Sequence, residues 1–106
     1  MAKYLVQAVY TADGTKGLMK EGGSSRKAAV EKAISGLGGK VEGFYYAFGA
    51  TDAFVLMDVA DAVSAMAISL AVNSTGAVRC SLVPLASVED VDAACKKTVA
   101  YRAPGA

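Results

Sequence analysis

The chain has 106 residues, of which 54% are hydrophobic, and a formal net charge of +1. This length suits one domain with a single core, and the balanced charge argues against a nucleic-acid or membrane partner. Without histidine, the commonest general base and most zinc and haem sites are excluded, so we expect neither a metal nor a cofactor. Cys80 and Cys95 have no metal-ligand spacing and are expected to stay reduced. No signal peptide or membrane-spanning run is apparent, which predicts a cytoplasmic protein.

The first half of the chain shows two strand patterns separated by a helix pattern. Residues 3–10 and 41–48 are rich in Val, Tyr and Phe, which is typical of β-strands. Residues 11–23 contain four glycines and are expected to form a loop. A helix capped by Ser24 or Ser25 follows and is expected to extend to about residue 37.

The second half repeats this alternation. The short connection from Gly49 to Asp52 predicts a hairpin between residues 41–48 and a strand at 53–59. Asp61 can cap a helix over residues 62–73, with an apolar stripe made by Val63, Met66, Ala67, Leu70 and Ala71. A fourth strand at 78–85 carries Pro84, which favours a sheet edge. A short helix is expected from about Ser87 to residue 97, with acidic residues in its first turn.

The order β-α-β-β-α-β with one appended helix predicts an α+β, ferredoxin-like domain over residues 1–98, with a tail at 99–106. Two helices would cover one face of its antiparallel four-stranded sheet. The strands, however, are apolar on both faces: in the first strand Leu5 and Val9 alternate with Tyr4 and Val6. We therefore expect the second face to pack on another copy, giving a homodimer or a higher homo-oligomer.

The hairpin between the second and third strands is the first candidate for a ligand site. Asp52 either fixes the turn, with Gly49 supplying a positive φ, or lies at the mouth of a cleft as a base or hydrogen-bond acceptor. The aromatic residues that would line such a cleft are Tyr45, Tyr46 and Phe48.

A second candidate is the glycine-rich segment before the first helix. The backbone N–H groups of Gly22, Gly23 and Ser24 could receive an anion, with Lys16 and Arg26 adding positive charge. The alternative is that these residues only begin a helix, since the spacing of a phosphate-binding P-loop is missing.

Arg79 is a third candidate, inside the fourth predicted strand. Its guanidinium either reaches solvent at the sheet edge or binds a carboxylate or a ligand. In the tail, Tyr101 and Arg102 are expected to anchor against a neighbouring subunit.

Several separated segments also resemble GYD-domain proteins, in the same order along the chain. These segments are Lys3-Tyr4 and residues 16–26, 44–49, 69–73 and 100–105. The resemblance implies a ferredoxin-like domain that forms a dimeric α/β barrel and is widespread in bacteria. The family is named after a Gly-Tyr-Asp element, usually with one residue between Gly and Tyr. Here Gly49 and Asp52 match that element, but Thr51 stands in place of the tyrosine.

Two functional classes follow, with a third kept open. The first is a homo-oligomeric module that binds or senses a small ligand, in a pocket lined by the predicted aromatic residues together with Tyr4 and Met57. The second is a cofactor-independent monooxygenase or isomerase, which is an analogy at the level of the fold alone. The third is a self-assembling scaffold without a ligand.

Overall fold

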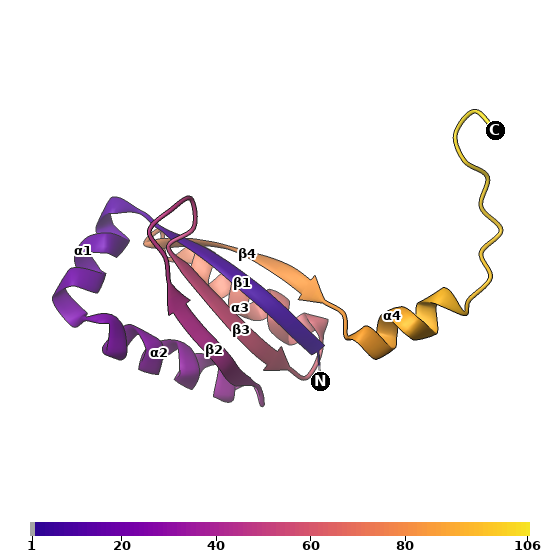
Figure 1. Ribbon diagram of the computed structural model, residues 1–106. Helices are drawn as coiled ribbons and strands as arrows, with labels where there is room; N and C mark the ends of the chain where they lie inside the picture. Colours follow the sequence, from indigo (N-terminus) through magenta and orange to yellow (C-terminus); the bar gives the residue numbers. More distant parts are fainter. Residues whose placement is uncertain (1) are drawn as a thin grey trace.

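A computed structural model describes residues 2–106 as one antiparallel sheet with helices on one side (Figure 1). In chain order its elements are β1 (Ala2–Tyr10), α1 (Ala12–Glu21), α2 (Gly23–Ser35), β2 (Lys40–Tyr46), β3 (Ala53–Val59), α3 (Ala62–Ser74), β4 (Val78–Leu85) and α4 (Val88–Cys95). The strand order is β2-β3-β1-β4. This is the predicted ferredoxin-like α+β fold, with α1 as an additional helix and α4 as the expected short C-terminal helix.

The central strand β1 pairs antiparallel with β3 and with β4, and the predicted hairpin between β2 and β3 is present. Pro84 lies in β4, which is an edge strand, as predicted. Near Val41 the β2–β3 register shifts by a bulge. The extra residue brings Val41 into the core beside Phe44, whereas strict alternation had placed the two on opposite faces.

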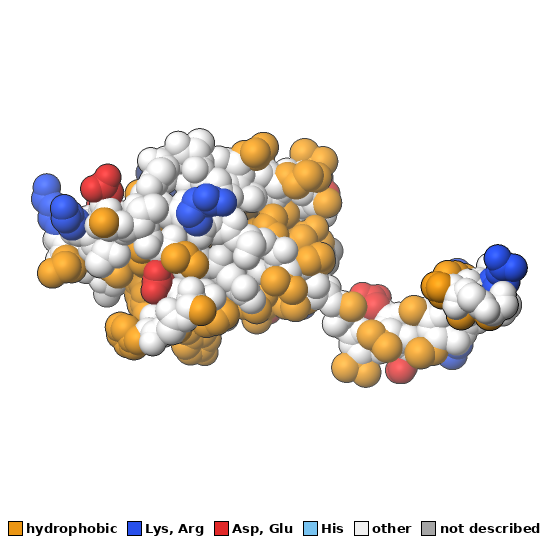
Figure 2. Space-filling view, turned by 90° about the horizontal axis from the view of Figure 1, so that it is seen from above, with side chains coloured by type: hydrophobic (Ala, Val, Ile, Leu, Met, Phe, Trp, Pro, Cys, Tyr) orange, Lys and Arg blue, Asp and Glu red, His pale blue; other side chains and the backbone are white. Residues whose placement is uncertain are grey.

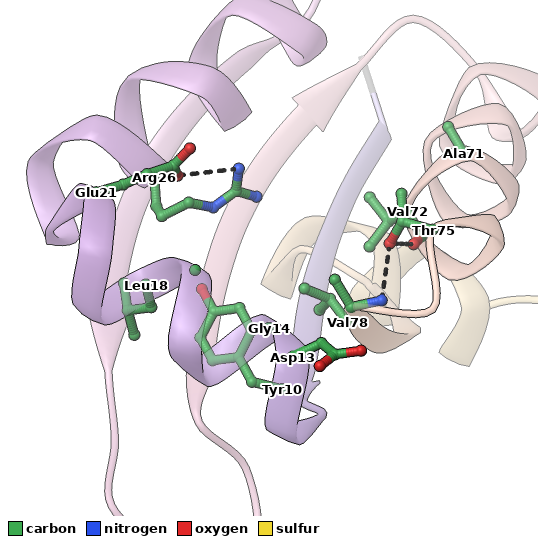
Figure 3. A pocket seen from close by; sticks show the side chains of 12 residues that line it. Tyr10, Asp13, Gly14, Leu18, Glu21, Arg26, Ala71, Val72, Thr75 and Val78 are labelled. Carbon is green, nitrogen blue, oxygen red and sulfur yellow. Dashed lines mark hydrogen bonds and ion pairs between the residues drawn. The ribbon is translucent and has the colours of Figure 1, made fainter.

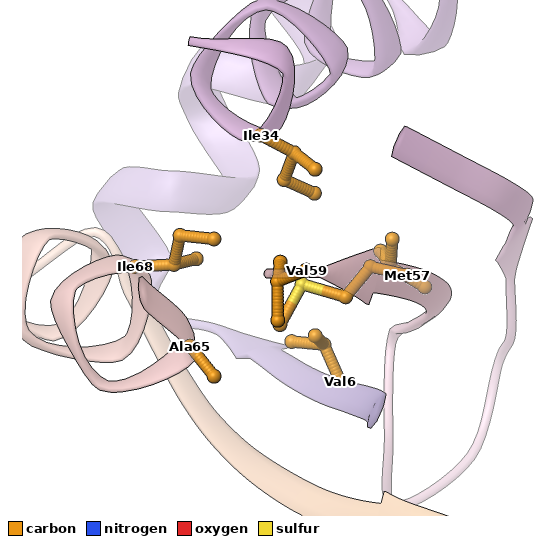
Figure 4. Close-up of a cluster of buried hydrophobic side chains, with 7 residues drawn as sticks. Val6, Ile34, Met57, Val59, Ala65 and Ile68 are labelled. Carbon is orange, nitrogen blue, oxygen red and sulfur yellow. The ribbon is translucent and has the colours of Figure 1, made fainter. Parts of the chain in front are cut away.

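The core lies between the sheet and helices α2 and α3. Ile34 of α2 and Ile68 of α3 point towards Met57 and Val59 of β3 (Figure 4), and Met57 and Val59 are fully buried. Met57 therefore belongs to the core and lines none of the surface clefts described below, contrary to the sequence-based expectation. Burying each side chain of this size contributes about 1.5–3 kcal/mol of transfer free energy.

Helix α3 packs through a different face from the predicted one. Asp61 caps it as expected, because its carboxylate accepts a hydrogen bond from the Ser64 N–H at 2.8 Å. The face against the sheet, however, is Ala65, Ile68 and Val72. The predicted stripe is on the opposite side, where its large members are exposed: Val63 (71%), Met66 (53%) and Leu70 (72%). Helix α3 thus has two apolar faces, of which the core uses one.

The predicted loop at residues 11–23 is wrong, because this segment forms α1 and the start of α2. The Thr11 hydroxyl caps α1 by accepting a hydrogen bond from the Gly14 N–H at 3.3 Å. Gly22 has a positive φ of 85° and makes the sharp turn between the two helices. Helix α2 begins at Gly23 without a side-chain cap, so the expected capping by Ser24 or Ser25 is absent.

Gly14 sits inside α1 because the helix approaches the Ala77 backbone, just before β4, too closely for a side chain. A Cβ atom at this position would lie 1.9 Å from the Ala77 carbonyl oxygen. Gly17, one turn further along, has open space around the same position. Gly14, one of the glycines on which the loop prediction for residues 11–23 rested, is therefore required by packing.

The helix and strand ends differ from the predictions by a few residues. Helix α2 ends at Ser35, β2 ends at Tyr46, and α4 ends at Cys95. The Ser87 hydroxyl caps α4 by accepting from the Asp90 N–H at 3.0 Å. None of the helices in residues 2–106 has both the length and the apolar composition needed to cross a membrane.

We predict opposite effects from adding a methyl group at these two glycines. Gly14→Ala should lower the unfolding temperature, because the new Cβ displaces α1 from the Ala77 backbone. Gly17→Ala should raise stability by up to about 1 kcal/mol through helix propensity, since nothing obstructs its side chain. Thermal unfolding followed by circular dichroism compares the two variants. Equal changes in both would contradict the close approach at Gly14.

Candidate functional site

Two adjoining clefts open beside α1, on the helical side of the sheet. One, of about 360 Å³, lies between α1, α2 and α3, and the other, of about 370 Å³, lies between α1 and the end of β2. Tyr10 and Leu18 line both, so we treat the two together as the α1 cleft. In Figure 3, Arg26 from α2 and Val72 from α3 lie on opposite sides of the first cleft.

Two tyrosines at strand ends form the walls of the cleft. Tyr10 ends β1 and Tyr46 ends β2, and both side chains lie on the helical face of the sheet. Between them the sheet carries only small buried side chains, because Ala53 of β3 pairs with both Ala8 and Tyr46. The short alanines leave room above the sheet that longer core residues would fill.

The Tyr46 ring is held in one orientation. Its hydroxyl donates a hydrogen bond to the Gly23 carbonyl at 3.0 Å, and its ring packs edge-on against Phe44, with centroids 5.2 Å apart. Burial raises the pKa of the Tyr46 hydroxyl, and the neighbouring Tyr10 phenol raises it further, while the positive charge of Arg26 acts in the opposite direction. Tyr46 is therefore a neutral phenol at physiological pH.

Arg26 supplies the positive charge of the cleft. Its side chain is two-thirds buried, and its nearest anionic group is the Glu21 carboxylate, at 3.9 Å. This separation is too long for a hydrogen bond. Among residues 2–106, the guanidinium donates no hydrogen bond to another protein group, so its fixed set of donors is available to a ligand.

Asp52 takes the turn-fixing role that was one of its two predicted alternatives. Its carboxylate accepts a hydrogen bond from the Tyr10 N–H at 2.8 Å, and its own N–H donates to the Ala8 carbonyl at 2.9 Å. Its carbonyl accepts from the Ala47 N–H at 2.8 Å. Asp52 also lines the second cleft, next to Phe48. Gly49 does not have a positive φ, so that part of the turn prediction is wrong.

The remaining predicted site residues fall in several places. Tyr46, Phe48 and Asp52 come together at the second cleft with Gly23, whereas Arg26 lines the first. Lys16, Gly22 and Ser24 are exposed and line neither cleft, and anion binding at the start of α2 stays a prediction.

The other two predicted ligand residues lie across the sheet. Tyr45 and Arg79 belong to the sheet face that no helix covers, which we call the open face. There Arg79 lines a shallow hollow with Thr51, the residue that stands in place of the family tyrosine. This hollow is separated by the sheet from the α1 cleft.

Sequence reasoning missed Tyr10, Leu18 and Val72 as cleft residues. Tyr10 continues the inward-facing series of Tyr4, Val6 and Ala8, so its position at a strand end was a usable signal. Leu18 has no such signal, because the glycines of residues 11–23 hide the helix that presents it. Among residues 2–106 no three Cys, Asp or Glu side chains are grouped so that they could hold a metal ion.

The open face carries the strongest electrostatic cluster of the domain. Lys3 Nζ contacts the Glu42 carboxylate and donates to Asp58 Oδ2 at 3.0 Å. The pKa of Asp58 is lowered, first by the neighbouring Glu42 side chain and then by Lys3. The same two partners raise the pKa of Lys3, with Glu42 contributing most. Oδ1 of Asp58 is buried without a hydrogen-bond partner in the described part of the chain.

The fold and the α1 cleft together define a small ferredoxin-like α+β domain with an aromatic-walled surface cleft. A family model for the GYD domain matches residues 4–95, which is most of the chain. The chain therefore belongs to the GYD-domain family. Neither the curated proteins nor the solved structures include a significant match to this chain.

We predict that Asp58→Asn makes stability less sensitive to acid. The folded pKa of Asp58 lies below its unfolded value of about 3.9, so its stabilising contribution is present above that pH and is lost as the pH falls through the folded pKa. Unfolding temperatures measured from pH 7 to about pH 2.5 should therefore fall more steeply in the wild type below about pH 4. Asp92→Asn, in exposed α4, is the control. Parallel curves for wild type and Asp58→Asn would contradict the prediction.

Proposed function

We propose that this GYD-domain protein binds a small, largely apolar molecule in the α1 cleft, through one head group that accepts hydrogen bonds from Arg26. The observation that supports this most directly is the Arg26 guanidinium, two-thirds buried in a mostly apolar cleft and without a hydrogen bond to another protein group among residues 2–106. A partly buried cationic donor with unused hydrogen-bonding capacity is stabilised when a partner occupies it. A carboxylate head group matches the planar donor geometry of arginine.

The shape of the cleft supports the apolar part of this ligand class. Each of its two parts has a volume at the lower end of the range typical for small-molecule sites. Leu18 and Val72 supply aliphatic surface, and Tyr10 and Tyr46 supply rings on which an aromatic or aliphatic chain can lie. Asp13 and Glu21 at the rim disfavour a ligand with more than one negative charge.

Binding has more support than catalysis. A general base near neutral pH needs a pKa tuned towards that pH, and the pKa of Tyr46 is shifted upwards, away from it. The Asp52 carboxylate is already engaged by the Tyr10 backbone. The tyrosines therefore fit the role of neutral walls and hydrogen-bonding groups.

We further propose that the protein works as a homo-oligomer that pairs through the open face. Three of the four strands contribute apolar side chains to this face. They are Leu5 and Val9 in β1, Phe54 and Leu56 in β3, and Val83 in β4. No helix within residues 2–106 packs on it. Sheet-to-sheet contact would cover these side chains and exclude water from the Lys3–Glu42–Asp58 cluster.

Binding is tested with a panel of probes that share a carboxylate: benzoate, phenylacetate and octanoate, with benzamide as the neutral analogue. We expect at least one carboxylate to bind in isothermal titration calorimetry, and Arg26→Ala to weaken it at least tenfold, or about 1.4 kcal/mol. The matched control is Lys27→Ala, which removes an exposed charge from the next position of α2.

Two results would reject the proposed ligand class. One is that no member of the panel binds the wild type. The other is that Arg26→Ala and Lys27→Ala change the affinity equally. Arg26 would then act only through long-range electrostatic attraction and not through a direct hydrogen bond to the ligand. Retention of Arg26 dependence for benzamide would show that a neutral carbonyl is sufficient as head group.

Pairing through the open face predicts that Leu56→Asp weakens self-association at least tenfold, because it would bury a charge between two sheets. Ala29→Asp introduces the same charge on the exposed side of α2 and should leave the dissociation constant unchanged. Sedimentation velocity over a concentration series measures both. A wild-type protein that stays monomeric throughout would contradict the proposed assembly.

A further inference from the structure

The last 21 residues leave the body of the domain as a separate arm, which we call the C-terminal arm (residues 86–106). Figure 1 shows α4 continuing away from the end of β4, with the chain end still further out, and Figure 2 shows the arm standing apart from the rest of the molecule. The chain has a radius of gyration of 16.9 Å, whereas a compact domain of this length has about 13 Å.

The arm contains a well-formed helix that lacks a packing partner. Ser87 caps α4, and Glu89 and Asp90 in its first turn suit the positive end of the helix dipole. An isolated helix of eight residues is nevertheless marginal in water and depends on packing of an apolar face. Val88, Val91 and Cys95 form such a face at i, i+3 and i+7, and Val88 and Val91 are 75% and 51% exposed.

The outer side of α3 offers a matching face. Val63, Met66 and Leu70 have the same i, i+3, i+7 spacing, which covers about 10 Å of helix in both cases. Helix α3 contains no charged residue, so an acidic helix can lie on it without repulsion. In α3 the side opposite these apolar residues packs in the core. In α4 the opposite side carries acidic residues.

The exposed surface area of the chain is larger than that of a compact domain. The chain exposes 7292 Å², whereas a compact monomer of its mass exposes about 5,500 Å². The excess of roughly 1,700 Å² is about twice what each partner buries in an interface of standard size. If two copies packed reciprocally across a two-fold axis, the arm of each copy would cover the exposed apolar face of α3 in the other.

We infer that the C-terminal arm of one copy packs on a second copy of the chain, with the Val88–Val91–Cys95 face of α4 against the Val63–Met66–Leu70 face of the partner's α3. The arm points away from its own α3 and follows directly from β4 through only two residues. The exchange is independent of ligand binding in the α1 cleft. It adds a second contact to pairing through the open face and does not require it.

Sedimentation velocity tests the arm with two matched variants. Val91→Asp places a charge in the apolar face of α4, and Ala93→Asp places the same charge on the opposite side of the same helix. Val91 and Ala93 are exposed, so neither change should alter the thermal unfolding of the body. We expect the dissociation constant to rise at least tenfold for Val91→Asp and to stay within twofold of the wild type for Ala93→Asp.

The outcome separates this inference from the proposed open-face pairing. Weakening by Leu56→Asp together with a wild-type dissociation constant for Val91→Asp would overturn the arm exchange and leave the open-face dimer standing. Weakening by Val91→Asp alone would support the arm exchange by itself. Equal weakening by Val91→Asp and Ala93→Asp would overturn the assignment of the α4 face.

Disulfide trapping with the native Cys95 locates the contact. In a Cys80→Ala background, Val63→Cys and Leu70→Cys each place a thiol in the α3 stripe, and Glu31→Cys places one on exposed α2 as the control. Mild oxidation should give covalent dimers for at least one of the α3 variants, well above the level for Glu31→Cys. A disulfide within one chain would show that the arm folds back on its own α3 and would overturn the exchange, as would trapping no better than the control.

Discussion

The arrangement of the α1 cleft depends on the way Asp52 joins the ends of three strands. Through its carboxylate, N–H and carbonyl it extends the hydrogen bonding of the sheet beyond the last paired residues of β1, β2 and β3. This holds Tyr10 and Tyr46 on the same face with the small Ala53 between them. A carboxylate that satisfies a buried backbone N–H is costly to replace, since the N–H would lose its partner. The aspartate of the family element thus has a structural reason to be present even though Thr51 replaces its tyrosine.

The order and type of the strands could be predicted because alternation is a local signal, and so could the caps at Asp61 and Ser87. The predictions that were wrong concerned features that depend on contacts between residues distant in the sequence. Gly14 looked like a loop residue, yet it is a packing glycine inside α1, and its reason is the carbonyl of Ala77. In α3 both helix faces are apolar, so the sequence offered no way to tell which of Ile68 or Leu70 faces the sheet.

The candidate site was predictable in part. Tyr46, Phe48, Asp52 and Arg26 were singled out from their residue types and do line the α1 cleft. Tyr45 and Arg79, which are among the predicted ligand residues, lie instead on the open face. Tyr45 and Tyr46 face different surroundings because successive side chains of a strand point to opposite faces of the sheet.

The contact between Gly14 and the Ala77 backbone has a consequence for how this protein can change. The Gly14 backbone of α1 lies directly against the Ala77 backbone, and hydrogen bonds of the main chain and of the Asp52 carboxylate hold the strand ends, so this frame does not depend on the side chains of Thr15 and Leu18. Thr15 and Leu18 project from that frame without belonging to the buried core around Ile34 and Met57. Substitutions at these two positions can alter which molecules the cleft admits at little cost in folding stability, which makes it a suitable starting point for evolving or engineering new ligand specificity.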